Sequence, residues 1–272
     1  MSVCGAHCTE VGVRVGVRVG VTVRVTVGIV QADCDEKAVP RRDRVVVGRR
    51  AFVAALALLG TASSCADGPG ASETIAEATV RVRADGCGPR TELGVGTSIG
   101  DGLVVTAAHV VAGSDHVEVV GGFGAPVGAD VVFFDPALDV AALRPAAPVG
   151  RPAPIRGERA DEGDIGLIAI ASDDGSIELV EVEVVQQVTI LTTDIYRDAS
   201  VERPGLRVAV DVSPGDSGAM VHLTGGGVGI VWSRSTESTD RAWTVDVPTE
   251  LLDATSRRSL RSPVDTGACL DP

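Results

Sequence analysis

The feature that most limits the fold of this chain is a series of short segments in which apolar and polar residues alternate. We expect one set of strands from about Thr74 to residue 134 and a second set between residues 164 and 247; glycine- and aspartate-rich turns separate the segments. Alternation with a period of two is the pattern of half-buried β-strands, and regularly spaced turns favour an all-β fold. Because only 3% of the residues are aromatic, the core must be built mainly from Val, Ala, Leu and Ile.

A proline-rich stretch separates the two sets, with prolines at positions 145, 148, 152 and 154. Such a stretch cannot be a central strand, and we interpret residues 146–157 as a connector. The chain is therefore expected to form two small packed barrels, over residues 66–145 and 158–272. Within the second range, Pro248–Leu260 predicts one terminal helix, because proline is favoured in a first helical turn. Ligand clefts are common at such domain junctions.

Residues 45–65 have the pattern of an export signal: two arginines, the apolar run 51–60, and small residues that end at Cys65. The apolar run is too short to span a bilayer, which needs about 20 residues. "RRAFV" resembles a twin-arginine signal, and "ASSC" resembles a bacterial lipoprotein cleavage box in which Cys65 is lipidated. Ordinary cleavage near Ser64 is the alternative. We expect an exported protein, located in the cell envelope or periplasm, lipid-anchored through Cys65 or secreted.

The segment before this signal, residues 1–44, has valine at every odd position from 11 to 27, a pattern that is typical of aggregation-prone strands. Because an export signal normally lies at the amino terminus, we expect this segment to be absent from the working protein. Cys4, His7 and Cys8 fall within it, and no metal site is predicted there.

The residues after Cys65 include 15 Lys or Arg against 32 Asp or Glu, a net charge of −17. No basic patch is available for phosphates, which argues against nucleic acid as a partner and favours attraction of cationic peptide segments. If Cys65 carries lipid, Cys87 and Cys269 are left to form a disulfide in an oxidising compartment. On the loop-entropy account, that bridge would stabilise the fold by at most about 5 kcal/mol.

Three residues in the two expected barrels have the chemistry of a nucleophilic site. Ser217 lies in "SPGDSGAMV", a sequence that alone would indicate only a turn. His109 follows an apolar strand and two alanines, and Asp139 is isolated among Ala, Val and Leu, where a buried charge would need a partner. By contrast, His116 is interpreted as a surface residue and Asp135 as a turn residue.

"TAAHVV", "DVAAL" and "GDSG", in that order, resemble the three signatures of the chymotrypsin- or trypsin-like serine protease family. The resemblance covers about residues 74 to 250, and the order His, Asp, Ser distinguishes this family from subtilisin-like enzymes and α/β-hydrolases. It implies two six-stranded antiparallel β-barrels with a C-terminal helix. It further implies that His109 is the general base, Asp139 its orienting carboxylate and Ser217 the nucleophile, and that the N–H groups of Gly215 and Ser217 form an oxyanion hole.

The sequence also departs from the family in ways that affect activation and specificity. In animal relatives, the aspartate before the serine pairs with a newly formed amino terminus; "RVVVG" at 44–48 lies upstream of the export core, so Asp216 needs another partner. Asp211 and the "GIVWSRS" residues Ser233 and Arg234 are candidates for substrate binding. The role of Arg234 is left open among four alternatives. It could neutralise Asp211, block the substrate pocket or favour acidic substrate side chains; alternatively, Arg234 and Asp211 are both exposed surface charges.

We therefore predict a serine endopeptidase that cleaves protein or peptide substrates through an acyl-enzyme, as a monomer, without metal or cofactor. Nucleic acid is not expected to bind, and contact with a membrane is expected only through lipid at Cys65. The alternative is a catalytically inert trypsin-like fold that serves as a binding or scaffold module in the cell envelope.

Overall fold

The computed structural model of the protein describes residues 70–122, 124–171, 176–236 and 238–270. Residues 1–44, the export signal expected over 45–65 and its Cys65 lie outside these ranges. Within the described ranges, no helix is long and apolar enough to cross a membrane.

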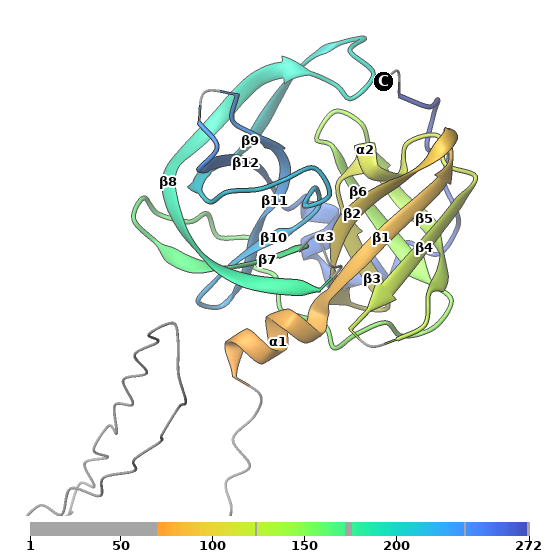
Figure 1. The fold of residues 1–272 in the computed structure, drawn as a ribbon, viewed down its shortest axis with the longest axis horizontal. Coiled ribbons are helices and arrows are strands. Elements are labelled where there is room, and N and C mark those ends of the chain that lie inside the picture. The colour runs from red at the N-terminus through yellow and green to blue at the C-terminus, as the bar shows by residue number, and fades with distance from the viewer. Residues whose placement is uncertain (1–69, 123, 172–175, 237, 271–272) are drawn as a thin grey trace, which may run out of the picture. The chain divides into compact units, whose positions relative to one another are not determined.

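Two six-stranded antiparallel sheets, each closed on itself, make up the described part of the chain (Figure 1). The first contains β1 (Thr79–Gly86), β2 (Gly88–Gly100), β3 (Leu103–Thr106), β4 (His116–Gly121), β5 (Val127–Asp135) and β6 (Val140–Pro145). The second contains β7 (Ile165–Ala171), β8 (Ile177–Thr193), β9 (Ser200–Ala209), β10 (Met220–Leu223), β11 (Gly226–Arg234) and β12 (Arg241–Asp246). The strand order 1-2-3-6-5-4 recurs as 7-8-9-12-11-10, and the β7–β10 closure is short. The predicted fold of two six-stranded units is confirmed.

In the described ranges, four short helices flank the barrels: α1 (Ala71–Ala78), α2 (Ala108–Val111), α3 (Thr249–Leu252) and α4 (Ala254–Ser259). The expectation of strands from about Thr74 was wrong, because α1 runs to Ala78 and buries Ile75 against the protein. The single terminal helix expected over 248–260 is instead two helices. Asp253 separates them, since its backbone is extended and its carboxylate accepts a hydrogen bond from Ser256 N at 2.6 Å to cap α4.

Three buried apolar clusters hold the strands together. Two of them fill the interiors of the barrels. The third lies between the barrels and joins residues of β3, β5 and β6 to residues of β10, β11, β12 and α3. In β3, for example, Val104 packs inside the first barrel while Leu103 and Val105 pack toward the second. Strands buried on both faces explain why "LVV" is a continuous apolar run, and they fix the two barrels against each other.

The proline-rich segment links β6, which ends at Pro145, to β7, which begins at Ile165. It contacts both sheets, since Ala153 N donates to Ser98 O and Arg156 N donates to Gly227 O, each at 2.9 Å.

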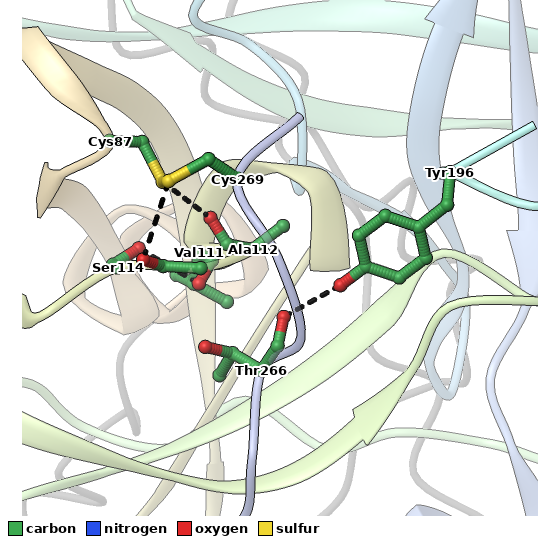
Figure 2. The surroundings of a disulfide bond; sticks show 8 residues. Cys87, Val111, Ala112, Ser114, Tyr196, Thr266 and Cys269 are labelled. Carbon is green, nitrogen blue, oxygen red and sulfur yellow. Dashed lines mark hydrogen bonds between the residues drawn. A yellow bond between two sulfur atoms is a disulfide. The ribbon is translucent and has the colours of Figure 1, made fainter. Parts of the chain in front are cut away.

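The carboxyl-terminal tail returns to the first barrel, where Cys269 forms a disulfide with Cys87, as predicted (Figure 2). Beside the disulfide, Gly113 N donates to Thr266 O at 3.1 Å. The hydroxyl of Tyr196, in the β8–β9 hairpin, donates to the same carbonyl at 2.6 Å. The tail thus connects the first barrel to a hairpin of the second.

Candidate active site

His109 lies on the single-turn helix α2, directly after β3. Ala107 and Ala108 before it are completely buried, and their small side chains allow other backbone to approach closely. Ala108 N donates to the carbonyl oxygen of Asp139 at 3.2 Å, and His109 N donates to Asp139 Oδ1 at 2.8 Å. Two backbone groups of α2 therefore hold the turn that carries the aspartate.

Asp139 and His109 are joined through their side chains. Asp139 is only 2% exposed, and its Oδ2 lies 2.8 Å from His109 Nδ1. Because a carboxylate oxygen can only accept, the proton of the neutral imidazole resides on Nδ1, which leaves Nε2 as an acceptor. Asp139 has a φ of +63°, a left-handed backbone conformation that is uncommon for residues other than glycine, although aspartate adopts it more readily than most.

The environment of His109 changes its pKa in two opposing ways. Burial acts to lower the pKa, but the hydrogen bond and the negative charge of Asp139 outweigh it, so that the pKa is raised above the ordinary value of 6.5. The positive charge of Arg203 lowers the pKa and the more exposed Glu92 raises it, both to a smaller extent. The site therefore favours the imidazolium form, which a general base must adopt during catalysis.

Ser217 lies in the turn between β9 and β10, and this turn is docked on β2 of the first barrel. Val95 N donates to the carbonyl oxygen of Ser217 at 2.9 Å. A β-carbon at Gly94 would lie within 3 Å of both this carbonyl oxygen and the side chain of Val110, the residue after His109. The backbone of Gly94 thus lies close to both the serine turn and α2.

Gly218 completes this docking. A β-carbon there would collide with the carbonyl oxygen of Val95 and the hydroxyl of Thr106, and its φ is +92°. Only glycine satisfies both the backbone conformation and the close approach. The glycine after the serine is thus required by contact between the barrels.

Asp139 and His109 are in direct contact. Ser217 is linked to them only indirectly, through the contacts of its turn with the backbone of Gly94 and Val95. Among the described residues, no hydrogen bond joins the Ser217 hydroxyl to the His109 ring. Catalytic hydrogen bonds are often long in a free enzyme and shorten when substrate binds.

Two backbone N–H groups near Ser217 are unused. In the part of the chain that the structure describes, neither Gly215 N nor Ser217 N donates to a protein acceptor. Gly215 has a φ of +107°, and the space where a β-carbon would stand is open. These two donors are available to an external acceptor.

Asp216 is 2% exposed and has the partner that its position requires. Its Oδ1 accepts from Ala171 N at 2.8 Å and its Oδ2 accepts from Ser213 N at 2.7 Å. Backbone donors thus occupy the carboxylate to which a new amino terminus binds in the animal relatives, and the serine turn is braced without such a terminus.

A small cavity of about 120 Å³ adjoins Ser217. It is lined by Val212, Ser213, Pro214, Ser217, Val231, Ser233 and Arg234. Of the three predicted substrate-binding residues, Ser233 and Arg234 therefore lie at this cavity. Asp211 is exposed and is not part of the lining. A second cavity, of about 500 Å³, adjoins His109 and includes Glu92 and Leu270 among its lining residues.

The two rejected candidates lie where the sequence indicated. His116 is exposed and is 3.4 Å from Glu118, which makes it a surface residue. Asp135 Oδ1 accepts from Ala137 N and Leu138 N at 2.9 Å each, which is the hydrogen bonding of a turn.

Arg203 is the site residue that sequence reasoning missed. It lies on β9 of the second barrel and is 2% exposed, and its Nη1 is 3.9 Å from Asp139 Oδ2. The sequence signal was weak, because a single arginine before a proline in a strand is ordinarily exposed. No group of three or more His, Cys, Asp or Glu able to hold a metal ion occurs among the described residues.

The sequence matches that of the trypsin-like peptidase domain over residues 94–230. The serine proteases Rv3671c and MT3772, from two strains of Mycobacterium tuberculosis, are each 31% identical to it over 181 residues. Each match covers 65% of this chain and 45% of the relative, so the chain spans about half the length of these relatives.

Solved structures show the same likeness. The active form of the Rv3671c protease from M. tuberculosis superposes with a TM-score of 0.65 at 28% identity, covering 72% of this chain and 87% of that one. The inactive form gives 0.57 at 26% identity, covering 70% and 92%. The HtrA-type protease AlgW, with 21% identity and a TM-score of 0.53 over 65% and 58% of the two chains, shares the fold. The chain therefore belongs to the trypsin-like peptidase family.

Proposed function

We propose that this protein is a serine endopeptidase that hydrolyses peptide bonds through an acyl-enzyme on Ser217. The observation that carries the proposal is the buried Asp139–His109 pair, in which Nε2 of His109 is free to accept a proton. The turn that carries Ser217 is held beside this pair by its contacts with Gly94 and Val95 of β2. The higher TM-score against the active form of Rv3671c than against its inactive form also supports it.

In the proposed reaction, His109 Nε2 accepts the proton of the Ser217 hydroxyl while Oγ attacks the carbonyl carbon of the scissile peptide bond. Asp139 keeps the other ring proton on Nδ1 and stabilises the imidazolium. The negative charge that develops on the carbonyl oxygen is stabilised by hydrogen bonds that Gly215 N and Ser217 N donate to it, and each such donor is worth about 3–4 kcal/mol in the transition state. His109 then gives its proton to the leaving amine, and water hydrolyses the ester by the reverse proton transfers.

The peptide chain on either side of the scissile bond has a cavity available to it. The small cavity beside Ser217 would receive the side chain that precedes the bond, and the larger one beside His109 would receive residues that follow it. Neither cavity requires a metal or cofactor for this role, and we propose that the enzyme acts as a monomer.

Location is a separate part of the proposal and rests on the sequence of residues 45–65. We propose export to the cell envelope, with lipid at Cys65 as the only membrane contact. Growth with an alkyne-bearing fatty acid should label the wild type and leave Cys65→Ala unlabelled. Equal labelling of both would contradict the anchor.

The rival function is an inert trypsin-like module that binds without cleaving. It is favoured by one observation, the absence of a hydrogen bond between the described Ser217 hydroxyl and His109 ring. Hydrolysis of an unfolded protein such as reduced casein separates the two functions. We expect wild type and Ser259→Ala, an exposed serine on α4, to cleave it and Ser217→Ala to be inactive. Failure of a folded wild type to cleave any of several unfolded proteins would favour the rival.

A further inference from the structure

Arg203 is a buried cation that is held by both barrels. From the first barrel, the carbonyl oxygen of Ala137 accepts from Arg203 Nε at 2.7 Å. From the second barrel, the carbonyl oxygen of Thr193 accepts from Nη2 at 3.2 Å, and the guanidinium carbon lies 4.5 Å from the centre of the Trp232 ring. Arg203 thus donates from two of its nitrogens, stacks on an aromatic ring and is removed from solvent. Together these contacts fix the position of its guanidinium.

This fixed guanidinium faces the catalytic carboxylate. Ala137 is in the same β5–β6 turn as Asp139, so the Nε bond joins Arg203 to the backbone that positions the aspartate. Nη1 lies 3.9 Å from Asp139 Oδ2, the oxygen that also accepts from His109 Nδ1. At 3.9 Å the contact is between charges and is not a hydrogen bond, and in a site with little water such a contact is weakly screened.

We propose that Arg203 is a positioning residue of this active site, which fixes the Asp139 turn from the opposite barrel and limits how strongly Asp139 stabilises the charged form of His109. This proposal rests on the proposed function, since it concerns the same three residues. It gives the second barrel two contributions to the site: the nucleophile, and a charge that holds the partner carboxylate.

Among the described residues, few charges surround the pair. His109 is acted on by Asp139, Arg203 and Glu92, and of these only Arg203 lowers its pKa. Asp139, Asp135 and Asp194 act on Arg203. Removing the guanidinium therefore removes the single positive charge from the set that acts on His109. The pKa of His109 should then rise, and the neutral base should be lost at a higher pH.

The test measures the pKa of His109 directly, by NMR titration of the imidazole in the full chain, alongside the pH dependence of kcat/KM. In Arg203→Gln, we expect the pKa of His109 to rise by about one unit and kcat/KM on the acid side to fall about tenfold. Arg203→Lys keeps the positive charge but not the planar guanidinium with its two hydrogen bonds. It should therefore bring the pKa of His109 most of the way back to the wild-type value and restore less of kcat/KM. KM should change little, because Arg203 does not line either cavity beside the site.

Arg144→Gln is the matched control. Arg144 is also partly buried and also donates to backbone carbonyls, of Leu260 and Asp101, but it is not among the charges that act on His109. It should lower the melting temperature without moving the His109 titration.

An unchanged or lowered His109 pKa in Arg203→Gln would overturn the proposal, as would an equal shift in Arg144→Gln. If Arg203→Gln does not fold, Arg203→Lys provides the test. A pKa of His109 in that variant that differs from the wild-type value by as much as one unit would also overturn the proposal. An inactive wild type would count against the proposed function alone, since the NMR titration needs no turnover.

Discussion

Val95 N donates a hydrogen bond to the carbonyl oxygen of Ser217 at 2.9 Å, and this bond joins a strand of the first barrel to the serine turn of the second. Val95 itself packs with the core of the second barrel. The position of the proposed nucleophile relative to His109 thus depends on contact between two barrels that are separate in the sequence.

Gly94→Ala tests that contact. A β-carbon there would press on the Ser217 carbonyl and on Val110, and overpacking of this kind typically costs about 1–3 kcal/mol. We expect the variant to fold with a reduced melting temperature and to lose most of its kcat. Gly128→Ala on β5, where nothing lies within 4 Å of an added β-carbon, should retain both. Full activity of Gly94→Ala would show that the serine turn is not held by this approach.

The acid limb of the rate profile should lie above pH 6.5. The pKa of His109 is raised in the folded protein because Asp139 outweighs the effect of burial, so the base becomes protonated at a higher pH than a free imidazole. Measuring kcat/KM from pH 4 to 9 should show a decline that begins above 6.5 as the pH falls. A rate that stays flat down to pH 4 would exclude His109 as the base.

His222 should make the protein sensitive to acid. It is 4% exposed, its Nε2 has no hydrogen-bond partner among the described residues, and burial lowers its pKa to about 4. Because the folded pKa is below the unfolded value of about 6.5, this contribution to stability is complete above pH 6.5 and is lost as the pH falls toward 4.

Over that range the loss amounts to about 3 kcal/mol. Urea unfolding of His222→Gln at several pH values should show a weaker dependence on pH between 6.5 and 4 than wild type. The same slope for both proteins would mean that other groups cause the acid sensitivity.

Arg234 should govern which side chain precedes the cleaved bond. The cavity beside Ser217 has a volume of about 120 Å³, and the exposed Arg234 is among its lining residues whereas Asp211 is not, so we expect small or acidic side chains to be preferred there. Profiling with a peptide library should show that Arg234→Ala loses selectivity for acidic residues by about tenfold, as expected for one charge-assisted contact. Preference for Arg or Lys in the wild type would contradict this assignment.

The sequence predicted those parts of the fold that depend on local patterns, and its short motifs indicated the candidate site. Alternation and turn residues indicated the strands, and the "TAAHVV" and "DVAAL" segments indicated the two residues that do meet. Helix α1 was missed because it buries few residues and follows no long apolar repeat. The left-handed backbone of Asp139 and the partners of Asp216 were also invisible, because contacts made after folding determine them.

Arg203 shows the same limit most clearly. Its acceptor Ala137 is 66 residues away in the sequence, and its burial follows from the packing of two barrels, so no local pattern distinguishes it from a surface arginine. The packing of the turns likewise determines the volume of the cavity beside Ser217. It also determines that Asp211 does not line this cavity.

Covalent labelling with a fluorophosphonate tests directly whether Ser217 is an activated nucleophile, because this probe reacts with a serine whose proton is removed by a neighbouring base. We expect intact-mass analysis to show one added probe per chain and peptide mapping to place it on Ser217, with labelling lost in Ser217→Ala and strongly reduced in His109→Ala. A well-folded wild type that takes up no probe, or takes it up at another serine, would show that Ser217 is not the nucleophile.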